Sequence, residues 1–301
     1  MTQIRKVPVR QGFAWFVQAI NVGRRNPRAV FGAALLFICT LYGAGLILVL
    51  PVAMLARGGQ PDLTQIVPAI AAVFVGMVFL LPILLGGLMH VVREAEAGRP
   101  VRARDLFAPV RQKKAGALAL MGLIQIVLAI VGGVVVGLLA GSDYWTNYMS
   151  AVRGAMSGSV PVMPQPDHPG LLMVVQLLFN YFSYAIMLFS VPLILFASAT
   201  LSTAVKDSLR ASVSNIGANA LAALLFLFSV AASALVMLLL VALLSMIGGL
   251  VGGVLVMLLY IAYGAAVLVV LVAGSYFAWR DTFGDEAAVA LPPASLDSIE
   301  V

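Results

Sequence analysis

The chain has 301 residues, of which 62% are hydrophobic and 10% charged, and its mean hydropathy is +1.07. Soluble domains carry about 25% charged residues, so these values exclude an ordinary soluble enzyme, a disordered chain and a fibrous protein. They predict an integral membrane protein that crosses the bilayer several times. The net charge is +6, but no basic stretch is long enough to fold as a nucleic-acid-binding module, and Cys39 is the only cysteine, which excludes an internal disulfide.

Uncharged apolar runs mark the expected transmembrane helices. Each run is long enough for one helix of about 20 residues, and the last run, 211–279, is long enough for two, with a glycine-rich turn at 247–253. We therefore expect an all-α polytopic membrane protein with an N-terminal segment 1–28, a six-helix domain 29–279 and a tail 280–301. The six helices are expected at about 29–56, 65–92, 115–140, 171–199, 219–246 and 252–279.

The basic residues predict how these helices are oriented. Sixteen of the eighteen Lys and Arg residues fall on one side of the expected bundle, in 1–28, 93–114, 206–210 and at Arg280. The opposite side holds only Arg57 and Arg153. Loops rich in Lys and Arg stay in the cytoplasm, so both termini are expected to be cytoplasmic.

The longest loop on the opposite side covers 141–170. It begins with Tyr144 and Trp145, aromatic residues that suit a membrane interface, and its closing prolines exclude a regular helix there. Its polar residues Asp143, Asp167 and His168 match no metal-binding spacing. We therefore expect neither a metal nor a cofactor.

The first and last thirds of the chain resemble each other. NPRAVFGAALLF, which begins at Asn26, aligns without gaps with NIGANALAALLF, which begins at Asn215, and Arg93-Glu94 corresponds to Arg280-Asp281. A weaker middle copy aligns Asp105 with Asp207. The match predicts three parallel repeats, each with a short cytoplasmic helix, a span, an outer turn and a returning span. Asn26 and Asn215 should lie at equivalent junctions, where Asn can cap the following helix.

The short cytoplasmic helices are expected to be amphipathic. An apolar face recurs at helical spacing in three places: Phe13, Phe16, Val17 and Ile20; Leu106, Phe107 and Val110; and Val205, Leu209, Val213 and Ile216. This pattern is typical of a helix that lies in the membrane interface, with Trp15 at the border of its face. It is equally typical of a connecting helix packed under the bundle, and both descriptions can apply to the same helix.

Several short motifs resemble a group of uncharacterised bacterial membrane proteins with six helices. The motifs are Trp15-Phe16, the loop from Arg93 to Phe107 with Gly98-Arg99-Pro100 and Asp105-Leu106-Phe107, and Trp279 to Gly284. These families are related to the membrane domain of some glycerophosphodiester phosphodiesterases. The resemblance implies a multi-pass protein of the bacterial inner membrane, and it implies no reaction.

The chain carries few groups that support catalysis or ion coupling. None of its 30 charged residues lies centrally in an expected span, which argues against a proton- or sodium-coupled pump. His90 and His168 are the only histidines, and no hydrolase, zinc or phosphate-loop motif is present. A non-enzymatic membrane protein is therefore expected.

Two groups of residues are candidate binding sites. A basic loop could bind anionic lipid or a membrane protein partner, although its charges could also serve only to orient the protein: Arg93, Arg99, Arg102, Arg104, Arg111, Lys113 and Lys114. One face of the fourth span is polar, which predicts either hydrogen bonds between helices or a polar ligand site: Gln176, Asn180, Ser183 and Tyr184.

The second candidate site supports an alternative function. Together with the prolines Pro82 and Pro192, the polar face would suit a transporter or channel for a lipid-like or small neutral solute. Glycines spaced by four, such as Gly133 and Gly137, predict close helix packing, which can lie within one chain or between copies. The oligomeric state therefore stays open at this point.

Overall fold

A computed structural model describes residues 4–55, 63–156, 160 and 162–284. This part of the chain contains ten α-helices, one 3-10 helix and no strand, which confirms the all-α class. Six helices are long and apolar enough to cross a membrane, as expected: α2 (Pro27–Leu55), α3 (Leu63–Glu96), α5 (Ala115–Ala140), α7 (Pro169–Phe196), α9 (Ile216–Ser245) and α10 (Gly249–Phe283). The shorter elements are α1 (Gln11–Ile20), η2 (Ala103–Phe107), α4 (Ala108–Arg111), α6 (Tyr144–Met156) and α8 (Leu201–Ser214).

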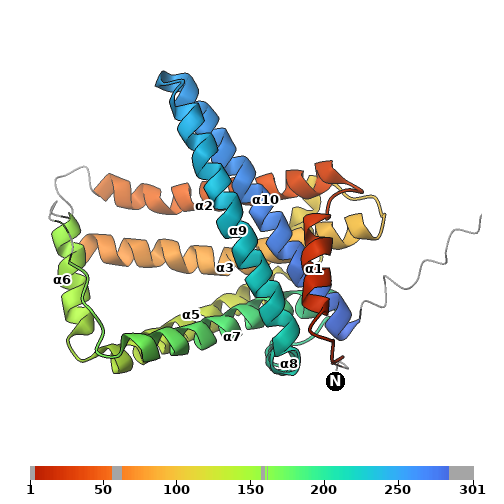
Figure 1. Ribbon diagram of the computed structural model, residues 1–301, viewed down its shortest axis with the longest axis horizontal. Coiled ribbons are helices and arrows are strands. Elements are labelled where there is room, and N and C mark those ends of the chain that lie inside the picture. The colour runs from red at the N-terminus through yellow and green to blue at the C-terminus, as the bar shows by residue number, and fades with distance from the viewer. Residues whose placement is uncertain (1–3, 56–62, 157–159, 161, 285–301) are drawn as a thin grey trace, which may run out of the picture.

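The long helices form three hairpins, α2 with α3, α5 with α7, and α9 with α10. The first two hairpins lie side by side through the packing of α3 against α5, and α9 and α10 cross them obliquely (Figure 1). Helices α1 and α8 and the segment around η2 all lie at one end of the bundle, which we call the basic end (Figure 1).

The apolar core is concentrated at the basic end. Buried side chains cluster in 29–37 of α2, 84–95 of α3, 185–195 of α7 and 265–283 of α10. Toward the opposite end, large apolar side chains such as Leu46 in α2 are exposed. The helices therefore pack tightly at the basic end and present apolar surface elsewhere, as expected for helices surrounded by lipid.

The three short elements interlock the hairpins. Helix α1 precedes the α2–α3 hairpin but packs against α9 and α10, whereas η2 precedes α5 and packs against α2 and α3. Helix α8 precedes α9 and packs mainly against α7. Each short element thus packs on the hairpin before it, and α1 packs on the last one. The three units form a closed cycle, which we call the three-unit ring.

The docking of α1 closes this ring. Trp15 is fully buried, and its indole N–H donates to Asp281 at 2.9 Å. The backbone N–H of Arg5 donates to the carbonyl of Thr282 at 2.8 Å. Gly12 lies so close to α9 that a Cβ atom would stand 2.2 Å from the Ala218 carbonyl oxygen, so a larger residue cannot fit without moving the helix. Trp15 is therefore a core residue and not the interfacial border that the sequence predicts.

Asn26 and Asn215 occupy the equivalent junctions that the repeat predicts, immediately before α2 and α9. Asn26 caps its helix, since its Oδ1 accepts the Ala29 N–H at 3.2 Å. The capping prediction is wrong for Asn215. Its Oδ1 accepts the Val7 N–H at 2.9 Å and its Nδ2 donates to the Arg5 carbonyl at 3.0 Å, because the N-terminal segment lies against this junction.

Two further expectations are corrected. The sequence predicts only a loop at the start of 141–170, but Tyr144–Met156 forms helix α6. Residues 280–283 continue α10, with Thr282 and Phe283 buried, so they are not part of a tail. The glycine turn lies where it is expected, with Gly248 in the left-handed region of φ. Arg57, expected on the side opposite the basic loops, and Pro161, one of the closing prolines of the 141–170 loop, lie outside the described residues.

Candidate functional site

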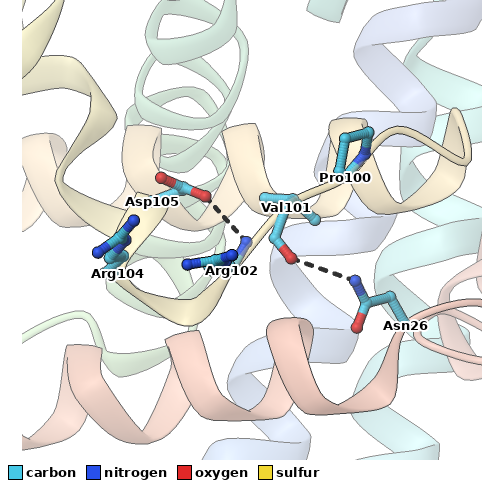
Figure 2. Close-up of a pocket in the computed structure, with 6 residues that line it drawn as sticks. All are labelled: Asn26, Pro100, Val101, Arg102, Arg104 and Asp105. Atoms are coloured by element: carbon cyan, nitrogen blue, oxygen red, sulfur yellow. Dashed lines mark hydrogen bonds between the residues drawn. The ribbon is translucent and has the colours of Figure 1, made fainter.

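A pocket of about 360 Å³ lies at the basic end, between the loop that precedes η2 and the start of α2. Figure 2 shows that Arg102 and Arg104 lie on the Asp105 side of the pocket, with Asn26 across from them. Pro100 and Val101 complete the lining. The pocket therefore combines residues that are distant in sequence, from the basic loop and from the first repeat junction.

Two glycines of the long helices let η2 pack closely against α2 and α3 beside the pocket. Gly87 of α3 faces η2 so closely that a Cβ atom would stand 1.6 Å from the Leu106 carbonyl oxygen. On the other side, a Cβ at Gly32 of α2 would lie 3.0 Å from the Cβ of Ala103. Since both glycines let η2 settle between two long helices, the positions of Arg102 and Arg104 are set by helix packing.

Asp105 holds the loop before η2 in place, and its negative charge is balanced by an ion pair with Arg111. Its Oδ2 accepts the backbone N–H of Arg102 at 2.8 Å, and its Oδ1 pairs with the guanidinium of Arg111. Burial raises the pKa of Asp105, but the Arg102 N–H and the Arg111 charge lower it by more, so its pKa lies below the ordinary value. The carboxylate therefore stays ionised, and its ion pair is with Arg111 and not with Arg102 or Arg104.

The structure separates the seven predicted basic residues into two groups. One group is held by contacts within the chain: Arg93 lies over the Phe196 ring at 4.5 Å, Arg99 pairs with Glu94 at 2.5 Å, and Arg111 pairs with Asp105. Lys114 also belongs to it.

The Lys114 ammonium binds the end of α7. Its Nζ donates to the Leu195 carbonyl at 2.5 Å and to the Ser198 hydroxyl at 3.1 Å. Burial, together with the charge of Arg93, lowers the pKa of Lys114. These two contacts show that Lys114 joins the basic loop to the second hairpin and is not free for a ligand.

The second group contains Arg102, Arg104 and Lys113. All three side chains are exposed, and none has an ion-pair partner within the described part of the chain. Lys113 has a left-handed φ of 57° in the turn between α4 and α5, and it does not line the pocket. Arg102 and Arg104 are therefore the basic residues that a ligand in the pocket would meet.

The surrounding short helices indicate the depth of this pocket. The buried face of α8 carries short polar side chains: Asp207, Ser208 and Ser212. Leu209 and Val213 on its other face are exposed. Helix α1 likewise exposes Phe13, Val17 and Ile20. Outward apolar rows are the reverse of what a water-soluble helix shows, and they suit helices that lie in the membrane interface. The packing of α1 on α9 and α10 and of α8 on α7 confirms the predicted connecting role, and the interfacial role stays a prediction.

The predicted polar face of the fourth span lies on the outside of the bundle. Gln176 donates to Asn180 at 3.3 Å, Asn180 is exposed, and Tyr184 is 68% exposed. Ser183 is turned inward, and its hydroxyl has no hydrogen-bond partner among the described residues. These residues do not line either of the two pockets at the basic end and in the α9–α10 hairpin.

Sequence reasoning found the arginines of the pocket but missed Asn26 as a lining residue. Asn26 was expected only as a cap, which it is, yet its Nδ2 also donates to the Val101 carbonyl at 3.3 Å. The Asn-Pro pair signals a helix start but not a contact 75 residues away. Within the described ranges, no group of three or more His, Cys, Asp or Glu side chains could hold a metal ion.

Comparison with known proteins covers less than half of the chain. Residues 69–195, which run from α3 through the pocket loop to α7, match a family model described as predicted integral membrane protein (DUF2189). No curated protein and no solved structure matches the chain. None of these comparisons supports the expected relation to glycerophosphodiester phosphodiesterase membrane domains. The family match and the six candidate spans together describe a multi-pass integral membrane protein.

Proposed function

We propose that the protein is a non-enzymatic membrane protein whose pocket binds the phosphate group of an anionic lipid in the cytoplasmic leaflet of the bacterial inner membrane. The observation that carries the proposal is the presence of two exposed guanidinium groups, Arg102 and Arg104, in one pocket without carboxylate partners among the described residues. Guanidinium groups bind phosphate with parallel hydrogen bonds, and phosphate is the charged group that anionic lipids present at this depth.

The position of the pocket supports a lipid over a soluble ligand. Val110, which follows η2 on α4, is 53% exposed, and it extends the outward apolar surface of the short helices beside the pocket. A lipid bound there would place its phosphate at Arg102 and Arg104 and its chains along this apolar surface. Each basic residue near an anionic membrane surface contributes about 1 kcal/mol, so two arginines give a measurable preference for anionic over zwitterionic lipid.

The structure gives the solute-transport alternative no comparable support. Its polar residues Asn180 and Tyr184 face outward from α7, while the basic end beneath them is filled by the buried core. A transport route would require polar residues that face one another across a continuous passage, and the described pockets do not provide one. Lipid binding at the basic end is therefore the function that the geometry supports best.

Native mass spectrometry of the full-length protein in mild detergent tests the proposal. Phosphatidylglycerol and phosphatidylethanolamine would be added separately to the natural sequence and to an Arg102→Gln, Arg104→Gln double variant. The double variant should bind phosphatidylglycerol about tenfold or more weakly. Phosphatidylethanolamine should lose less affinity, because its ammonium group offsets the charge of its phosphate. A Lys206→Gln, Arg210→Gln variant is the matched control, because it removes two exposed charges from α8 at the same end.

Three results would contradict the proposal. Unchanged phosphatidylglycerol binding in the double variant would leave the arginines with an orienting role only. An equal loss in the α8 control would show that general charge, and not the pocket, attracts the lipid. Strong binding of inorganic phosphate without binding of phosphatidylglycerol would assign the pocket to a soluble phosphate compound.

A further inference from the structure

Helix α7 carries an exposed row whose spacing is that of a helix-pairing surface. Met173, Leu177 and Tyr184 are 74%, 69% and 68% exposed, and Asn180 between them is also exposed. The intervals along this row are four, three and four residues, which is the repeat that keeps one face of a helix against a parallel partner. The row therefore forms a straight surface stripe, which we call the α7 stripe.

The polar group of this stripe lies deep in the membrane. Asn180 is eleven residues from the start of α7 at Pro169, so it lies about 17 Å along the helix, near the middle of a hydrocarbon layer of about 30 Å. Its Oδ1 accepts a hydrogen bond from Gln176 at 3.3 Å. Within the described chain, the Asn180 NH₂ donors and the Gln176 carbonyl have no other partner. Lipid chains offer no hydrogen bonds, so this arrangement calls for a partner with polar groups at the same depth.

The other sides of α7 are already in use. Phe179 packs beside Gly132 of α5, where a Cβ atom would stand 2.9 Å from its ring. On the side of α8, Ser190 and Ser208 are hydrogen-bonded at 2.8 Å and Tyr181 donates to the Ser212 carbonyl at 3.0 Å. Val174 and Leu178 on the neighbouring face are also exposed, but they are purely apolar and suit lipid contact. The α7 stripe is thus the exposed face of this helix that also carries a polar group, the Asn180 amide, with donors that have no partner within the described part of one chain.

We propose that the α7 stripe is the contact between two copies of this chain in the membrane. Two copies inserted in the same orientation can be related by a two-fold axis along the membrane normal, which brings equivalent residues together at equal depth. A carboxamide is both donor and acceptor, so Asn180 can pair with Asn180 of a second copy. An Asn at such a position in a parallel helix pair favours a dimer in a single register.

The choice of a second copy follows from this self-complementarity. A lipid cannot satisfy the Asn180 amide, and an unrelated helix would need its own polar residue at the same depth and in register with Leu177 and Tyr184. A second copy meets both conditions without further assumption. The proposal does not depend on lipid binding at the basic end, since the stripe and the pocket share no residue.

Disulfide cross-linking of the full-length protein in lipid vesicles tests the contact. In a Cys39→Ser background, Leu177→Cys should form a covalent dimer on mild oxidation, because equivalent positions across the axis come within disulfide reach. Leu178→Cys is the matched control, since Leu178 is 51% exposed on the same helix but points about 100° away from Leu177. Equal cross-linking at both positions, or none at Leu177→Cys, would overturn the proposal.

Substitution of Asn180 tests the polar contact separately. The dimer dissociation constant would be measured by single-molecule photobleaching in bilayers as the density of the protein is lowered. Asn180→Leu should raise this constant about fivefold to tenfold, while Asn180→Gln, which keeps the amide, should restore most of the affinity. Asn180 is exposed, so neither change alters the core. An Asn180→Leu variant that dimerises as tightly as the natural sequence would refute the role of the amide.

Discussion

The indole N–H of Trp15 donates to the carboxylate of Asp281 at 2.9 Å, across 266 positions of the chain. The same Oδ2 atom also accepts from Gln11 at 2.7 Å, and Oδ1 accepts from Arg280 at 2.9 Å. Asp281 therefore joins α1 to the end of α10 with two hydrogen bonds, while Arg280, its neighbour in α10, donates a third. Because α1 is the element that closes the three-unit ring, this carboxylate is one of the polar contacts that join the first and last units.

Replacing Asp281 with Ala should destabilise the protein by about 2–4 kcal/mol, because the donors of Trp15 and Gln11 lose their shared acceptor. The measurement is thermal unfolding in detergent followed by circular dichroism. Phe13→Ala, an exposed change on the same helix α1, is the control and should leave the midpoint nearly unchanged. Equal midpoints for Asp281→Ala and the natural sequence would show that α1 docking contributes little.

Gly87→Ala should displace η2, because the added Cβ atom would stand 1.6 Å from the Leu106 carbonyl oxygen. A backbone atom cannot move aside as a side chain can, so we expect a loss of at least about 2 kcal/mol and weaker lipid binding at the pocket. Gly133→Ala is the matched control in α5, where nothing lies within 4 Å of the added atom. Similar unfolding midpoints for the two variants would contradict the close packing of η2 on α3.

The Asp105 carboxylate should make stability depend on pH. Its pKa lies below the ordinary value of about 4, so its contribution is present above that value and is lost as the pH falls through the lower folded-state pKa. The difference in unfolding midpoint between the natural sequence and Asp105→Asn should therefore shrink on acidification below about pH 4. A difference that stays constant from neutral to acidic pH would exclude this role.

The orientation of the bundle can be tested with a membrane-impermeant thiol reagent. In a Cys39→Ser background, Val160→Cys should react in intact cells, since Val160 is 90% exposed in the loop that we expect to face outward. Gln112→Cys, exposed at the basic end, should react only after the membrane is opened. The reverse pattern would place the basic end outside the cell.

The long helices could be predicted from sequence because their signal is local. Uncharged runs separated by charged residues define the spans, and a helix in lipid needs no distant partner to satisfy its backbone. The amphipathic rows of α1 and α8 were visible for the same reason. The sequence places Trp15 at the border of an apolar face because its burial depends on Asp281, which the local pattern around α1 does not contain.

The sequence predicts the basic residues of the candidate site but not which of them are available to a ligand. An arginine is available only where the fold leaves its side chain without a carboxylate partner. The sequence shows seven basic residues in one loop, and Arg102, Arg104 and Arg111 all lie within six residues of Asp105. Only the fold of η2 and α4 shows that the side chain of Arg111 takes the carboxylate, while Arg102 contacts it through its backbone N–H. Asn215 illustrates the same limit, since its partners come from residues 5–7.

The three-unit ring has a consequence for the biosynthesis of the protein. Helix α1 leaves the ribosome before the other described helices, whereas its docking surface on α9 and α10 is made more than 200 residues later, which at about 5–20 residues per second is a delay of tens of seconds. During this time Trp15 has no acceptor, and α1 waits at the membrane surface on its apolar row. Synthesis of the α9–α10 hairpin is therefore the event that allows α1 to fold into place.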